Sequence, residues 1–373
     1  MVFKILFWRA LICLMAAGGL SLAAFGKNAP PREAVVPADP LEMAAGHIET
    51  VNAPAKRAAV VQLLAHARDS YALRNSGRGY DLKVSFTVNS GGETQYDGQW
   101  EMEDTFDPQQ GLRWTASTAA GYTTTQISTN GMFYREGTSS TIPLRLQEAR
   151  AALFDPIPPV PLLERDVIRT SASTYNGTPV TCVLLSRSGN AASRAPGRSW
   201  EETEECVDPQ SGLLRVHSQV PGRYYAYDYT NAPQFSGHMF PRKVAITEGG
   251  QTVTEITVNS LADLPAADAN LFVPTEEMRA AGPAVAMAGA QKIWFFSGRG
   301  PFPSGATAHP VCVFGLVTAS GQLVEAHSLQ PSDPNSAAAV QAAQRMNFSY
   351  PAPPGARPEQ HFVFIIDKFV SSQ

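Results

Sequence analysis

The chain has 373 residues, of which 44% are hydrophobic and 17% charged, with a formal net charge of -4 and a pI near 6.0. This balance is typical of a folded protein with room for two domains, and it excludes a disordered or fibrous chain. No basic stripe is present, so nucleic acid is not expected as a partner.

The first residues predict export from the cytoplasm. Lys4 and Arg9 precede an apolar run over 10–25, and Ala24-Phe25-Gly26 has the small-x-small pattern of a signal-peptidase site. Residues 1–26 are therefore interpreted as a secretory signal peptide, with a periplasmic location for the mature chain. An uncleaved inner-membrane anchor is the alternative, although the run is slightly shorter than the roughly 20 apolar residues of a membrane span.

Two segments follow with different patterns. Residues 27–55 are rich in Pro and Ala and predict a linker. Residues 55–74 predict an amphipathic helix whose start tolerates Pro54. Its apolar positions recur at helical spacing and are Val60, Leu63, Leu64, Ala67 and Tyr71.

From Tyr80 onward the apolar period changes to two, which predicts a run of antiparallel strands. A second helix is expected within "PLRLQEARAALFDPIPPVP", where a cluster of prolines ends it. Strands then resume as far as residue 263. The turn "DPQxGL" occurs at 107–112 and again at 208–213, with Gly where a positive φ is expected. The fold class predicted for 56–277 is α+β, with one curved sheet packed against helices.

This order of elements resembles the LolA-like half-barrel of bacterial outer-membrane lipoprotein-sorting proteins, over about 56–275. The resemblance is carried by "VVQLLAHARDSYALR", "LKVSFTV…GQWEME", "GMFYREG" and "ECVDPQSGLLRV". It implies an apolar groove for acyl chains on the concave face, and hence a lipid or lipoprotein as partner. The candidate groove residues are Val84, Phe86, Trp100, Trp114 and Phe133. The alternative is that these side chains form a plain core covered by the helices.

Three cysteines lie beyond the signal segment. Cys182 and Cys206 fall in neighbouring strand-like segments, and export would place them in an oxidising compartment, so a disulfide between them is predicted. Two separate buried thiols remain the alternative. Cys312 lies in the apolar run "HPVCVFGLV" and is expected to be a core residue.

Residues 278–308 are rich in Ala, Gly and Pro and predict a second linker. They include the aromatic patch "KIWFFSGRGPFPSG", interpreted as a loop packed on one domain or, alternatively, as an exposed recognition surface.

Residues 309–373 predict a small β-β-α-β domain. Strands are expected at "VCVFGLVTA", "QLVEAHSLQ" and "QHFVFIIDKF", with an Ala-rich helix that starts near Asn335–Ser336. Phe348 is expected to cap the core at the helix exit. About 309–369 resembles the C-terminal domain of the TonB family of energy-transducing proteins, in positions that include Gly315, Gly321 and Phe348. The long Pro/Lys-rich spacer of that family is absent.

The TonB-type resemblance implies that the last strand binds an extended segment of an outer-membrane transporter or another envelope protein by strand addition. The receiving edge would be formed by His361, Phe362, Val363, Phe364, Ile365 and Ile366. An ordinary strand without a partner is the alternative.

The sequence contains no nucleophile elbow, zinc-protease motif, P-loop or dinucleotide fingerprint. No enzyme activity, cofactor or metal is therefore predicted. The acidic run "EETEEC" at 201–206 is interpreted as a solvated strand edge, because alternate carboxylates of a strand point to opposite faces. The main hypothesis is a periplasmic binding or transport protein of TonB type; the others are a lipid or lipoprotein carrier and an envelope hydrolase that uses these carboxylates.

Overall fold

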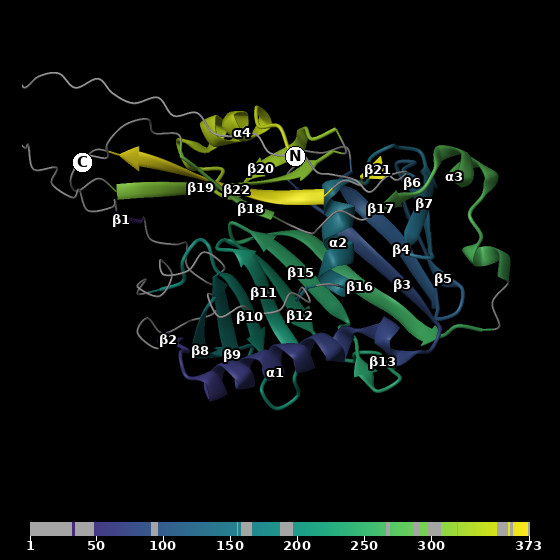
Figure 1. Ribbon diagram of the computed structural model, residues 1–373, viewed down its shortest axis with the longest axis horizontal. Coiled ribbons are helices and arrows are strands. Elements are labelled where there is room, and N and C mark those ends of the chain that lie inside the picture. The colour runs from purple at the N-terminus through teal and green to yellow at the C-terminus, as the bar shows by residue number, and fades with distance from the viewer. Residues whose placement is uncertain are drawn as a thin grey trace, which may run out of the picture.

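The chain folds into a large curved sheet and a smaller lobe that lies along one end of it (Figure 1). The computed structural model describes residues 32–33, 48–90, 96–154, 156–157, 166–186, 197–265, 269–285, 291–296, 307–318, 320–348, 357–358 and 361–371. The predicted signal peptide lies outside the described residues. Among the helices described, none has both the length and the apolar character that crossing a membrane requires.

The large sheet is open and has 15 strands within the described residues. Its neighbouring strands are antiparallel except for the last pair, β17 and β21. In spatial order the strands are β2 (Glu49–Thr50), β8 (Val167–Tyr175), β9 (Thr178–Ser186), β10 (Thr203–Val207), β11 (Leu214–Val220), β12 (Arg223–Asp228), β15 (Lys243–Glu248), β16 (Gln251–Asp263), β3 (Tyr80–Val88), β4 (Gly98–Asp107), β5 (Gly111–Thr118), β6 (Thr123–Thr129), β7 (Met132–Gly137), β17 (Ala284–Val285) and β21 (Arg357–Pro358).

Two helices cover one face of this sheet, as Figure 1 shows. Helix α1 (Pro54–Tyr71) has Pro54 at its start, where the missing N–H leaves no intrahelical bond unmade. Helix α2 (Leu144–Phe154) runs across the strands. The face covered by α1 and α2 is called the concave face below. The α+β class and the curved half-barrel with packed helices are confirmed.

The main core lies between the concave face and the two helices. The predicted helical face of α1 is confirmed: four of its five apolar residues are buried, and Leu63 is partly buried against the same core. The alternation in β3 places Leu82, Val84, Phe86 and Val88 in this core. The sheet therefore buries one apolar face, as a period of two dictates.

The repeated turn has the same chemistry in both copies. The Oδ1 atom of Asp107 accepts bonds from two backbone N–H groups that follow it, and Asp208 Oδ1 does the same. Gly212 has a φ of 72°, a conformation that side chains rarely adopt, and the ring of the exposed His66 of α1 lies against it. This turn therefore requires glycine for its conformation.

The smaller lobe has its own sheet and one helix. The strands are β1 (Arg32–Glu33), β18 (Gln291–Phe296), β19 (Thr307–Val317), β20 (Leu323–Ser328) and β22 (His361–Ser371), and the helix is α4 (Ser336–Gln344). The predicted β-β-α-β order of 309–373 is confirmed, with Asn335 at the N-cap. Phe348 is buried with Ala339 and Ala343 of α4 against β19.

An apolar cluster joins the lobe to the half-barrel. It combines Leu144 of α2 and Val220 of β11 with Cys312 and Phe314 of β19, all fully buried. Cys312 is thus the core residue expected from its sequence. The segment predicted as a second linker supplies strands to both sheets, because β17 pairs with β7 and β18 pairs with β22.

The other described elements are short. They are the 3-10 helices η1 (Leu73–Ser76) and η3 (Ala269–Phe272), the hairpin β13 (Gln234–Phe235) and β14 (His238–Met239), and α3 (Glu276–Ala281).

Candidate functional site

The structure brings four of the five predicted groove residues together. Val84, Phe86, Trp100 and Trp114 are at most 1% exposed and belong to the core beneath α1 and α2. Phe86 and Trp100 stack with ring centroids 5.4 Å apart. Phe133 is separate from them: it is only partly buried, on β7, opposite Ala284 of β17. A ligand role for these residues stays a prediction.

Polar contacts near the C-terminal end of α2 hold this helix on the apolar face. Asp104 of β4 is fully buried and lies 3.6 Å from both Arg74 of η1 and Arg150 of α2. The Tyr80 hydroxyl donates to Asp104 over 2.8 Å, and burial raises the pKa of that hydroxyl. Arg150 also lies 4.0 Å from the centre of the Trp114 ring. The helix is therefore held by a few charged contacts above an aromatic floor.

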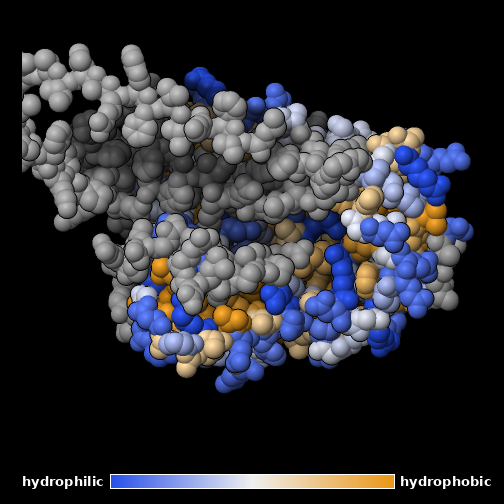
Figure 2. Space-filling model, in the orientation of Figure 1, coloured by the Kyte–Doolittle hydropathy of each residue, from blue (hydrophilic) through white to orange (hydrophobic). Residues whose placement is uncertain are grey.

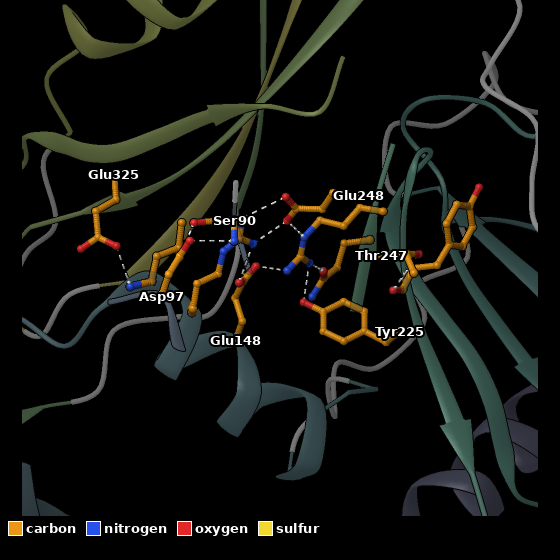
Figure 3. Close-up of polar contacts among 12 residues, drawn as sticks. Ser90, Asp97, Glu148, Tyr225, Thr247, Glu248 and Glu325 are labelled. Atoms are coloured by element: carbon orange, nitrogen blue, oxygen red, sulfur yellow. Dashed lines mark hydrogen bonds and ion pairs between the residues drawn. The ribbon is translucent and has the colours of Figure 1, made fainter. Parts of the chain in front are cut away.

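A second charged group fixes the other end of α2, next to the smaller lobe (Figure 3). Arg145 of α2 donates to Glu148 over 2.9 Å and to both oxygens of Glu248 over 2.6 and 3.0 Å. Arg223 of β12 pairs with the same two carboxylates and donates to the Tyr225 hydroxyl. Two arginines and two glutamates thus neutralise each other inside the protein.

The smaller lobe closes over this charged group. The guanidinium of Arg223 lies 4.4 Å from the centre of the Phe314 ring of β19. Glu325 of β20 accepts a 2.9 Å bond from the backbone N–H of Leu144, the first residue of α2. Figure 3 shows Glu325 directed at the helix start. The lobe therefore satisfies one of the N–H groups that a helix leaves unbonded at its N-terminus.

Glu248 and Glu325 have opposite electrostatic environments. Burial alone would raise the pKa of Glu248, but the charges and hydrogen bonds of Arg145 and then Arg223 hold it well below its usual range. Burial raises the pKa of Glu325, and its bond from Leu144 only partly offsets that rise. Sequence reasoning missed both carboxylates, because nothing in the local pattern indicates that two distant arginines converge on Glu248 or that Glu325 meets the start of α2.

The prediction that the acidic run is a solvated edge is wrong. β10 is an inner strand between β9 and β11, and Glu202, Glu204 and Glu205 are at most 1% exposed. Glu202 accepts two bonds from Arg169 and one from the Ser199 N–H. Such charges can be buried because arginines from other elements neutralise them, which the run by itself does not reveal.

The predicted disulfide between Cys182 and Cys206 is confirmed. The two residues face each other on β9 and β10. Glu204 lies near both sulfurs, but Arg198 binds its carboxylate over 2.8 Å and the sulfurs are bonded to each other. No thiolate is left to hold a metal, so this cluster is structural.

The predicted partner-binding edge lies on an inner strand. β22 pairs with β19 along its whole length, and on its other side Val363–Lys368 pairs in parallel with β18. Backbone groups on both sides of Val363–Ile366 are therefore already used. A partner strand can add there only if β18 leaves, so the proposed role of His361–Ile366 stays a prediction.

No protein-family model and no curated protein matches the chain. Similar solved structures include a LolA superfamily protein from Nitrosomonas europaea, with 10% identity, a TM-score of 0.37, and coverage of 57% of this chain and 97% of that one. A putative outer membrane lipoprotein-sorting protein domain from Vibrio parahaemolyticus has 10% identity, a TM-score of 0.35, and coverage of 56% and 95%. LprF from Mycobacterium bovis has 13% identity, a TM-score of 0.23, and coverage of 56% and 95%.

Proposed function

We propose that the protein is a non-enzymatic periplasmic carrier that holds the acyl chains of a lipid or lipoprotein inside the half-barrel. The observation that carries this proposal is the continuous apolar core between the concave face and only two covering helices. An open sheet with one apolar face needs a cover, which is either its own helices or an apolar ligand. In the described state α1 and α2 provide it.

Helix α2 is the cover that a ligand would replace. It is 11 residues long and contributes Leu146, Ala149, Ala152 and Leu153 to the core. Two of these are alanines, so α2 buries less apolar surface than an all-leucine face would. An acyl chain lying along the aromatic residues of the concave face would cover the apolar surface that α2 now covers. Figure 2 also shows apolar patches at the surface just above α1, between polar residues.

The periplasmic location rests on two features of the chain. The first is the predicted signal peptide over 1–26. The second is the Cys182–Cys206 disulfide, a bond that persists in oxidising compartments and is rare in the cytosol. Both agree with a protein that works in the cell envelope.

The test uses the two buried tryptophans of the floor as reporters. We expect 9,10-dibromostearate to quench the fluorescence of the purified protein, because bromine quenches only at close range, while stearate does not. A Trp100→Phe/Trp114→Phe variant should lose most of that quenching. Lipid extracted from the protein as purified from the cell envelope should contain acyl chains. Absence of both quenching and co-purified lipid would contradict the carrier function.

The second candidate function is docking of a partner protein by the smaller lobe. It closes the end of the half-barrel and holds the start of α2 through Glu325 and Leu144, so a partner that moves the lobe also loosens the cover. Energy transduction of TonB type would add strand binding to β22, which requires β18 to leave. The intact mass of the envelope protein separates these roles: a chain that starts near Lys27 favours a free carrier, and a retained 1–26 favours an anchored transducer.

A further inference from the structure

Glu205 and His217 form a buried polar pair on the concave face. They face each other on β10 and β11, with 3.6 Å between Glu205 Oε1 and His217 Nδ1, and they are 1% and 2% exposed. Glu205 also pairs with Val183, and His217 with Tyr225. Val183 and Tyr225 both belong to the main core, so the pair points into the interior of the half-barrel.

The polar atoms of this pair are not satisfied. Within the part of the chain that the structure describes, Glu205 Oε2 and both ring nitrogens of His217 make no hydrogen bond. The same is true of Thr254 Oγ1, which lies three strands from His217 in the same cross-strand row. A buried polar atom without a partner is destabilising, so such atoms in native proteins normally bind water or a ligand.

The surroundings limit which group can bind there. The Tyr225 hydroxyl is bound on one side by Arg223, from which it accepts, and keeps its own O–H for donation. The nearby arginines Arg145 and Arg223 are neutralised by Glu148 and Glu248, so these two charges do not attract an anion. Glu205 repels a carboxylate or phosphate. An ammonium would have to lose its water shell, whereas a hydroxyl can donate to Glu205 and meet the imidazole without burying another charge.

We propose that Glu205 and His217 form a subsite that binds a hydroxyl group of a neutral amphiphile, such as a glycerol headgroup, while its acyl chain lies on the apolar floor. This inference rests on the proposed carrier function and adds its ligand class. The apolar core continues from the subsite along the same face, from Val183 and Tyr225 to Val84 and Phe86. One ligand can therefore place its hydroxyl at the pair and its chain in the core.

The experiment compares two ligands with the same chain, 1-monooleoylglycerol and oleate, in competition with dibromostearate for quenching of tryptophan fluorescence. Wild-type protein should prefer the monoacylglycerol by about tenfold or more, the size of one hydrogen bond to a charged group. A Glu205→Leu/His217→Phe variant should keep its affinity for oleate within about threefold and lose the preference. Replacing both partners avoids leaving one of them unpaired.

Two controls separate the outcomes. Glu101→Gln changes an exposed carboxylate on β4 and should behave as wild type. Glu205→Gln keeps a hydrogen-bonding group but removes the charge, so it should retain part of the preference.

Equal affinity of the wild-type protein for the two ligands, or an unchanged preference in the double variant, would overturn the subsite and assign the pair to a buried water. Failure of the wild-type protein to bind either ligand would instead overturn the carrier function.

Discussion

The two faces of strand β10 both carry buried glutamates, but those on one face are bound by arginines and the one on the other face is not. On the face away from the helices, Glu204 is bound by Arg198 over 2.8 Å, next to the disulfide, and Glu202, just before the strand, is bound by Arg169. On the concave face, Glu205 is paired among the described residues with His217 alone, at 3.6 Å between Oε1 and Nδ1. Burial does not distinguish these carboxylates, but pairing does. The satisfied ones stabilise the sheet, and the unsatisfied one is the candidate for binding.

The largest expected effect comes from removing the arginine partner of a buried glutamate on the face away from the helices. Arg169→Ala removes the partner of Glu202 and leaves a buried charge without compensation, so the free energy of unfolding should fall by about 3–5 kcal/mol. Urea denaturation followed by circular dichroism measures it. The control is Arg78→Ala, which breaks an exposed pair with Asp263 and should cost less than about 1 kcal/mol. Equal losses in the two variants would contradict the structural role of the Arg169–Glu202 pair.

The disulfide beside Glu204 should give the next largest effect. Cys182→Ser/Cys206→Ser removes the cross-link between β9 and β10 and should lower the free energy of unfolding by about 2–4 kcal/mol. Reduced wild-type protein should show a similar loss, and the variant should not respond to reductant. A reductant-sensitive variant would show that the effect arises elsewhere.

Replacing Glu205 and His217 on the concave face should change the free energy of unfolding in a different way. Glu205→Leu/His217→Phe should leave the free energy of unfolding unchanged or raise it by about 1–4 kcal/mol, because apolar side chains replace a buried polar pair. His217→Phe alone should lower it, since Glu205 then keeps no partner. A double variant as unstable as the single one would show that the pair contributes to stability as Glu202 does.

The smallest effect concerns Glu325, where the smaller lobe meets α2. Burial raises the pKa of this carboxyl, so its protonated form suits the folded state better than its charged form. Its contribution to stability is therefore present below the pKa of about 4.3 in the unfolded chain, and is lost as pH rises through the folded pKa. Glu325→Gln stays uncharged and can still accept from Leu144. The variant should thus gain stability relative to wild type between pH 4 and 7, and a constant difference would contradict this.

Local patterns were sufficient to predict much of the fold. The helical spacing of Val60, Leu64, Ala67 and Tyr71 gave α1 and its buried face, and the alternation from Tyr80 gave the strand that carries Val84 and Phe86. These patterns work because the period of apolar residues follows directly from helix and strand geometry. The same reasoning predicted α4, its start at Asn335 and the burial of Phe348.

Tertiary structure alone decided which polar groups are satisfied. Arg169 reaches Glu202 from 33 positions away, and Arg145 reaches Glu248 from 103 away, so no local pattern shows that these charges are buried and paired. It also decided that β18 already pairs with part of the strand that was predicted to receive a partner. The period of apolar residues along the sequence determines which face of a helix or strand a side chain lies on. The partner of a buried charge depends instead on which distant segments of the chain come together. The unsatisfied pair of Glu205 and His217 could be found only once those segments were in place.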